Sequence, residues 1–301
     1  MKPKNEAEFF TALKEEYFLN SIEETIRSIK FITQAYTEVI NSIYNTEPNL
    51  KEGEVLIETL SYKILLTTHS ILELTKGFPL ETSLKKGTVE QLDFSSVHIL
   101  TRALIEAYLT LEYLYYNDLD PNEKLFRLRI WRISGYKSRQ GFFKSEQGYS
   151  DKIAHQLEGE ETEINDLLNL VKESVYYGKL TDQNLWKLDK YGLPRLMSWN
   201  VLLENSSLKT SVFSIPYKLY SNYAHSEFIS LIQMNGEDTM AKGSEHNDLH
   251  LMNALRIVKM INCISLVKCT NYFNLEIFDK IDIELKRTIE FWSEYASKES
   301  R

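Results

Sequence analysis

Residues that interrupt regular structure are scarce in this sequence, which has 11 glycines and 6 prolines among 301 residues. A chain of this kind has few turns and long elements, which favours helices over many short strands. Apolar residues recur at helical spacing, and Ser21 with Glu24 forms a capping-box pattern. We therefore predict an all-α multi-helix bundle, with a loop over 77–92 and helices over 21–45, 53–76, 94–117, 122–145, 150–175, 181–188, 194–205, 214–234, 244–273 and 276–298.

The domain organisation and the compartment follow from composition. No repeat or convincing linker divides the chain, which predicts a single helical domain over residues 1–301, or two interleaved helical layers, with the helices of residues 1–50 as a candidate peripheral layer. Cys263 and Cys269 lie on roughly opposite faces of one predicted helix and cannot pair there. The N-terminus lacks an apolar signal core, and no uncharged apolar run reaches about 18 residues. We expect a cytoplasmic protein without a membrane partner.

Charge and motifs exclude several functional classes. The formal net charge of -8 rules out a global basic field for nucleic acid, so any such contact needs a local basic patch. The sequence contains no GxxxxGK[ST], no GxGxxG and no GxSxG motif. Dinucleotide oxidoreductases and hydrolases with a serine nucleophile are therefore disfavoured. We expect no cofactor.

Residues 97–116 form the most apolar predicted helix, and apolar side chains cover nearly its whole circumference. Such a helix is usually buried on all sides, which predicts a long central helix in the core. Yet His98, Arg102 and Glu106 recur at i, i+4 and i+8 on one stripe. Arg102 and Glu106 form an internal salt bridge in one interpretation. In the other, the stripe lines a polar cleft in which Arg102 binds an anion.

A second helix with polar residues on an apolar face covers residues 215–232. His225 shares a side with Phe228, Ile229 and Ile232, and close to it lie Lys218, Ser221 and Asn222. A histidine in such company is either a hydrogen-bonded core residue or a general acid or base, since its unperturbed pKa is about 6.5.

The next helix begins with a second pair of histidines. His246 and His250 are four residues apart, with Glu245 beside them. One helical turn with this spacing can hold a metal, but the motif is not HExxH and the sequence fixes no third ligand. A solvated or hydrogen-bonded pair is the simpler interpretation, so we assign no metal ligand.

Residues 124–144 are basic in an otherwise acidic chain, with seven basic and no acidic residues. Arg129, Arg132 and Arg139 form a stripe mixed with apolar residues. In one interpretation they pair with the acidic predicted helix 150–175 in interhelical salt bridges. In the other they line the wall of a cleft and hold phosphates or a carboxylate.

Two segments resemble a known group of proteins. TRALIEAYLTLEYLYY (101–116) and YKLYSNYAHSEF (217–228) resemble a bacterial family of uncharacterised helical proteins, which is similar in turn to the HEPN class. Many HEPN proteins are metal-independent ribonucleases of prokaryotic defence or toxin–antitoxin systems. The resemblance implies a site at Arg102, Glu106, Ser221 and His225. The nuclease spacing of Arg four to six residues before His is absent, and the nearest basic residue before His225 is Lys218.

Two functions follow as expectations. In the first, Arg102, Glu106 and His225 are catalytic in a cleft that binds RNA or a nucleotide, with His98, Lys218, Ser221, Asn222, Arg129, Arg132 and Arg139 binding the substrate. In the second, the protein is a non-catalytic interaction module whose partner is another protein or a second copy, and the same polar residues are structural.

Overall fold

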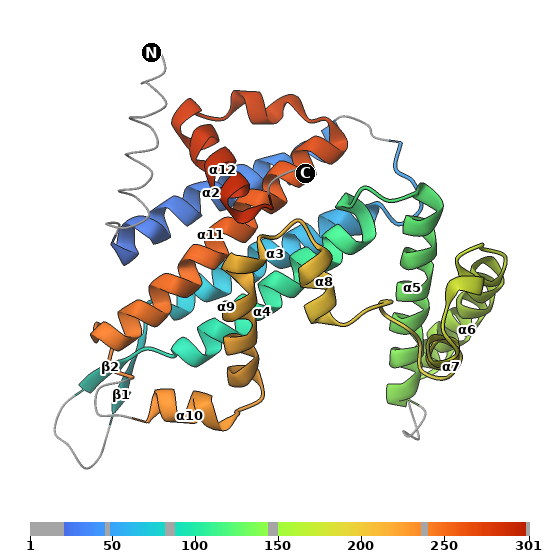
Figure 1. Cartoon of the computed structure of the whole chain (residues 1–301), viewed down its shortest axis with the longest axis horizontal. Coiled ribbons are helices and arrows are strands. Elements are labelled where there is room, and N and C mark those ends of the chain that lie inside the picture. The colour runs from blue at the N-terminus through green and yellow to red at the C-terminus, as the bar shows by residue number, and fades with distance from the viewer. Residues whose placement is uncertain (1–20, 46–48, 82–87, 144–149, 236–239, 299–301) are drawn as a thin grey trace. The chain divides into compact units, whose positions relative to one another are not determined.

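The computed structural model describes residues 21–298 apart from 46–48, 82–87, 144–149 and 236–239, and within them the all-α multi-helix prediction is confirmed (Figure 1). The helices are α2 (Ile22–Asn45), α3 (Val55–Leu74), α4 (Phe94–Leu111), α5 (Pro121–Phe143), α6 (Asp151–Lys172), α7 (Asp182–Lys190), α8 (Trp199–Asn205), α9 (Thr210–Ala224), α10 (Phe228–Met234), α11 (Glu245–Phe273) and α12 (Ile283–Ala296). A π-helix at Glu112–Tyr116 extends α4, and short 3-10 helices lie at Tyr177–Lys179 and Glu276–Lys280.

The local signals in the sequence act as predicted at several helix ends. At the start of α2, the Ser21 backbone N–H donates to Glu24 Oε2 at 3.0 Å, and the Glu24 N–H donates to Ser21 Oγ at 3.2 Å. This reciprocal pair satisfies two N–H groups that have no partner within the helix. Past the end of α3, Gly77 has a φ of +69°, a conformation that favours glycine. The capping box and the glycine stop are confirmed.

Two predicted elements differ from the structure. The expected loop over 77–92 contains a hairpin of β1 (Phe78–Glu81) and β2 (Thr88–Gln91), which pair antiparallel. The single helix expected over 214–234 is wrong: α9 begins at Thr210 and contains Pro216, and residues 225–227 separate it from α10. Ser226 within this break has a φ of 52°, which a continuing α-helix cannot include.

Contacts between Cα atoms divide the chain into two compact units. Unit 1 comprises residues 1–50, 55–110 and 207–301, and α11 packs in it against α2, α3 and α12 (Figure 1). The side chains of α2 include the fully buried Ile29, Ile32 and Tyr36. Residues 22–45 therefore belong to the core of unit 1, whereas a peripheral layer was the expectation, and residues 1–20 lie outside the described part.

Unit 2 comprises residues 51–54 and 111–206. In this unit α5 packs against α6 and α7, and its core includes Phe126, Ile130, Ile133 and Leu167. Helix α5 continues through Gly135 and Gly141 to Phe143.

The longest described helix is α11, which has 29 residues, 16 of them buried. By length and composition alone α11 could span a membrane, but 72% of its most apolar window is buried within the protein. That burial is typical of a core helix of a soluble protein. The predicted central helix, α4 with its π-helical extension, is also enclosed, and Ile99 is its one exposed residue.

Candidate functional site

Arg102 and Glu106, which the sequence places on one stripe of α4, meet Tyr217 of α9. Arg102 Nη2 lies 3.1 Å from Glu106 Oε1, and the Tyr217 hydroxyl donates to the same oxygen at 2.8 Å. The Arg102 guanidinium also lies over the Tyr217 ring, 5.5 Å from its centroid. The internal salt bridge between Arg102 and Glu106 is therefore present, and α9 contributes a third member that sequence analysis did not predict.

One ion pair and one hydrogen bond link the three side chains of this cluster. Burial, together with the hydrogen bond to Glu106, raises the pKa of Tyr217 to about 12, so its hydroxyl is a donor at neutral pH. Glu106 accepts from Tyr217 and balances the Arg102 charge, whereas Arg102 Nε is buried and has no hydrogen-bond partner among the described residues. The side chains of Arg102 and Glu106 keep 18% and 23% of their surface exposed, so solvent reaches the cluster.

His98 does not belong to this cluster, although the sequence places it on the same stripe of α4. It is fully buried, its ring stacks on Tyr220 with centroids 4.5 Å apart, and it meets the edge of Tyr223 at 4.6 Å. Neither ring nitrogen has a hydrogen-bond partner among the described residues. Burial, with a further contribution from His250, lowers the pKa of His98 to about 3. His98 is therefore a residue of the aromatic core, where burial favours the neutral imidazole.

His225 is exposed and forms the C-cap of α9, where its backbone N–H donates to the Ser221 carbonyl at 3.2 Å. Since α9 ends before it, the predicted shared face with Phe228 and Ile232 does not exist. His225 lies eight residues beyond Tyr217, roughly 12 Å along a helix axis. No described hydrogen bond, ion pair or ring contact joins His225 to Arg102 or Glu106, so the predicted catalytic trio is not assembled.

The residues predicted around His225 also do not converge on the Arg102 cluster. Lys218 is exposed. Ser221 and Asn222 are half-buried, and their backbone carbonyls accept the N–H groups of His225 and Glu227. These two backbone hydrogen bonds lie at the C-terminal end of α9. Ser221 and Asn222 therefore contribute to the turn that follows the helix.

His246 and His250 pack with His98 around the Phe94 ring. The centroids of His246 and His250 are 4.5 Å apart, and those of His98 and His250 are 5.0 Å apart. Burial and the neighbouring His246 lower the pKa of His250. Within the described ranges no group of three His, Cys, Asp or Glu side chains is arranged to hold a metal ion. The three imidazoles form an aromatic cluster.

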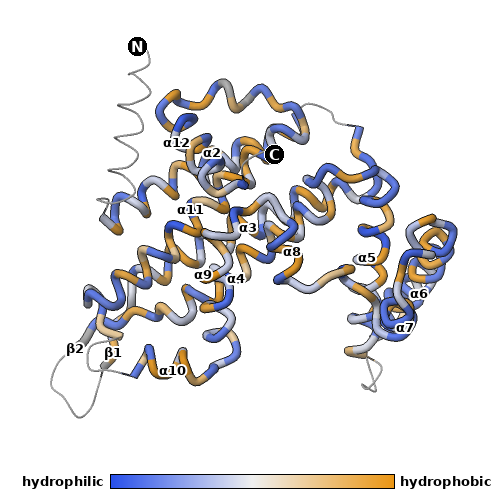
Figure 2. Tube along the Cα trace, in the orientation of Figure 1, coloured by the Kyte–Doolittle hydropathy of each residue, from blue (hydrophilic) through white to orange (hydrophobic). Residues whose placement is uncertain are grey.

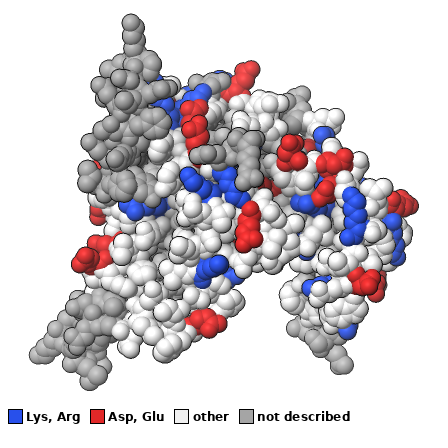
Figure 3. Space-filling view, in the orientation of Figure 1, with Lys and Arg blue, Asp and Glu red and all other residues white. Residues whose placement is uncertain are grey.

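The arginine stripe lies in unit 2, and its members are ion-paired. Arg129 Nη2 lies 3.0 Å from Glu52, and Arg132 contacts both Glu52 and Glu163. Arg139 pairs with the buried Glu160. The predicted salt bridges to helix α6 are therefore present for Arg132 and Arg139, while Arg129 pairs outside that helix. Figure 3 shows Lys and Arg interspersed with Asp and Glu on the face drawn.

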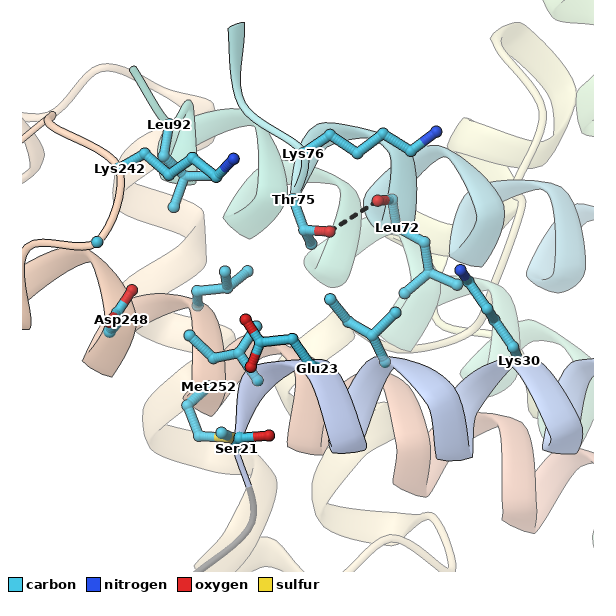
Figure 4. A pocket seen from close by; sticks show the side chains of 14 residues that line it. Ser21, Glu23, Lys30, Leu72, Thr75, Lys76, Leu92, Lys242, Asp248 and Met252 are labelled. Carbon is cyan, nitrogen blue, oxygen red and sulfur yellow. Dashed lines mark hydrogen bonds between the residues drawn. The ribbon is translucent and has the colours of Figure 1, made fainter. Parts of the chain in front are cut away.

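A groove of about 610 Å³ lies in unit 1, and none of the predicted site residues lines it. Its walls combine apolar residues of α2, α3 and α11 with ionic side chains that include Glu23, Lys30, Lys242 and Asp248. Figure 4 shows the Glu23 carboxylate toward the middle of the groove and the lysines at its margin. The sequence signal at this position, the capping box at Ser21, indicated a helix start and no ligand site.

Helix α10 carries the feature that sequence analysis missed. Phe228 is 76% exposed, and Ile229, Leu231 and Ile232 are 46%, 52% and 50% exposed. Figure 2 colours most of this short helix as hydrophobic. The sequence signal was the apolar run itself, but it was assigned to the core face of one longer helix. Exposed apolar patches of this kind mark interaction sites.

Comparison with protein families finds one relationship. Residues 60–242 match the model of a family of unknown function, DUF5677. The matched segment contains the Arg102 cluster, the arginines of α5 and the whole of α10. Searches of curated proteins and of solved structures found no match. Since the family model covers more than half of the sequence, the chain belongs to the DUF5677 family.

Proposed function

We propose that this protein is a non-catalytic helical module that acts by binding another protein, and that its buried polar side chains hold the helices in register. The observation that carries the proposal is the exposed apolar face of α10. Soluble proteins rarely expose four large apolar side chains on two turns of helix without a partner. Both cysteines are buried on α11, and a cytoplasmic location remains part of the proposal.

The polar clusters support the same proposal. Arg102 pairs with Glu106, which also accepts from Tyr217, and the arginines of the α5 stripe are paired with glutamates of their own unit. An anion that approached either cluster would meet a carboxylate already paired with arginine, and the like charge of that carboxylate would weaken its binding. We propose that the hydrogen bond from Tyr217 to Glu106 helps to join α9 to α4.

The test replaces the Arg102 cluster by apolar residues of similar size, with Arg102→Met, Glu106→Leu and Tyr217→Phe in one protein. A structural network replaced as a whole leaves the fold intact, and the melting temperature stays at or above that of the wild type. The matched control is Glu106→Leu alone, which leaves the arginine without its carboxylate and lowers the melting temperature. A triple variant that keeps its fold but loses an RNA-cleaving activity shown by the wild type would contradict the proposal.

A second candidate is an RNA- or nucleotide-binding effector of a prokaryotic defence or toxin–antitoxin system, in line with the HEPN resemblance. The favouring observation is that solvent reaches Arg102 and Glu106. His225 would act as acid or base on a 2′-hydroxyl, Arg102 or Lys218 would stabilise the phosphorane charge, and Glu106 would orient the arginine. If His225→Ala and Arg102→Ala each abolish RNA cleavage by the folded protein, this candidate replaces the first.

A further inference from the structure

The apolar and polar faces of α10 are inverted relative to an ordinary surface helix. At 100° per residue, Phe228, Ile229, Leu231 and Ile232 fall within roughly 160° of the circumference. Ser230 lies opposite the middle of that arc, and it is the buried residue, with 1% of its surface exposed. A surface helix normally turns its apolar stripe toward the core, so α10 presents to solvent the face that other helices bury.

Polar contacts hold α10 in this orientation. The Ser230 hydroxyl donates to the Glu227 carbonyl at 2.7 Å, and the Tyr223 hydroxyl at the end of α9 donates to Gln233 Oε1 at 2.7 Å. Ser226, with its φ of 52°, makes the turn between the two helices. The outward apolar face is therefore set by the packing of α10 on α9 and is available in the folded protein.

The charges near α10 select the kind of partner. The helix itself has no ionisable residue, and the exposed Glu227 stands at its N-terminal end. A second copy of the chain would bring another Glu227 and a formal net charge of -8, and an anionic membrane would repel the same acidic group. A partner with basic residues around an apolar stripe has the complementary charge.

We propose that the exposed face of α10 binds a short amphipathic helix of another protein, whose apolar stripe is flanked by lysine or arginine. This inference rests on the proposed interaction function and names the partner's chemistry. Phe228, Leu231 and Ile232 contact the apolar stripe, and Glu227 pairs with a flanking basic residue. Two turns of α10 offer a contact of about 10 Å in length, so the complex is of the small, transient class.

The experiment uses the full chain and a fluorescent synthetic helix of about five turns, with leucines on one face and lysines on the other. A second probe carries glutamates in place of the lysines. Fluorescence anisotropy measures the affinity of the wild type, of Ile232→Glu and of Leu66→Glu. Leu66 is 65% exposed on α3, so its substitution adds the same negative charge away from α10. A neutral variant, Leu231→Asn, repeats the test without a charge change, and circular dichroism checks each fold.

The lysine probe is expected to bind the wild type and Leu66→Glu equally, and to bind Ile232→Glu and Leu231→Asn at least about tenfold more weakly. The glutamate probe is expected to bind the wild type more weakly than the lysine probe. Equal affinity of the wild type and Ile232→Glu, or a preference for the glutamate probe, overturns the inference.

The same variants also test two other binding partners for the exposed face of α10, a second copy of the chain and a lipid membrane. If analytical ultracentrifugation shows a concentration-dependent dimer that Ile232→Glu abolishes, this result assigns the face to a second copy and overturns the inference. If flotation shows binding to phosphatidylglycerol vesicles that Ile232→Glu abolishes, this result assigns the face to lipid and also overturns the inference. The non-catalytic role of the polar residues is tested separately by the Arg102 triple variant and the RNA assay, which do not involve α10, so its failure is distinguishable from a failure of the helix-binding inference.

Discussion

At the scale of single residues, the polar side chains of α4 lie in two different environments. Arg102 and Glu106 form an ion pair, and Glu106 also accepts a hydrogen bond from Tyr217. His98, one turn earlier, is buried among aromatic rings with no hydrogen-bond partner at either nitrogen in the described chain. A buried imidazole without a partner remains neutral, because the charged form would lose its hydration.

The first prediction concerns the pH dependence that His98 imposes on stability. Its pKa is about 3 in the folded protein, against about 6.5 in an unfolded chain. Between these values the unfolded state binds the extra proton, so the free energy of unfolding falls as the pH drops below about 6.5 and is unaffected by this group above it. His98→Phe removes this effect and keeps a ring at the position.

Urea denaturation at about pH 7.5 and about pH 5 measures the difference. From the linkage relation, the wild type loses about 2 kcal/mol more stability than His98→Phe over this interval. His250 and the carboxylates are common to both proteins, so their contributions cancel in the comparison. The same loss in both proteins would show that His98 is not the titrating group.

At the scale of elements, helix ends and breaks decide which faces are buried. Residues 225–227 separate α9 from α10 and rotate the apolar run of α10 away from the core. In unit 2, Gly192 has a φ of +86° next to Ser134, and a Cβ built there would lie 2.5 Å from the Ser134 Cα atom. The segment after α7 can approach α5 this closely because residue 192 has no side chain.

Gly192→Ala is therefore expected to destabilise unit 2, because the new methyl group meets backbone atoms and the φ is unfavourable for alanine. The combined cost is about 2–4 kcal/mol in the free energy of unfolding. Gly178→Ala is the matched control, since a Cβ at Gly178 meets nothing within 4 Å. Chemical denaturation of both variants compares the two effects, and equal stability of both would refute the steric argument.

At the scale of the whole molecule, the chain forms two compact units with separate cores. Ile261 is fully buried in α11 of unit 1, and Ile133 is fully buried in α5 of unit 2. Each core is packed by its own set of helices. A cavity made in one core therefore removes packing contacts within that unit and destabilises that unit first.

Ile133→Ala and Ile261→Ala are each expected to cost about 2–5 kcal/mol through lost burial and a residual cavity. Hydrogen exchange read by mass spectrometry is expected to show the loss of protection in α5, α6 and α7 for Ile133→Ala. For Ile261→Ala the loss is expected in α2, α11 and α12. Uniform loss across all helices in either variant would mean that the two units open as one.

The sequence by itself determined the elements whose signals are local. The capping box at Ser21, the stop at Gly77 and the scarcity of Gly and Pro fixed helix type and several ends, because these effects act within a few residues. The i, i+4 pairing of Arg102 with Glu106 also follows from helix geometry alone.

Only the tertiary structure decided which side chains meet. Tyr217 reaches Glu106 from a position 111 residues away, and no local pattern records that contact. The separation of His225 from Arg102, the burial of His98 and the inverted face of α10 depend on how α4, α9 and α11 pack. A sequence period says which residues share a face, but it does not say what that face is packed against.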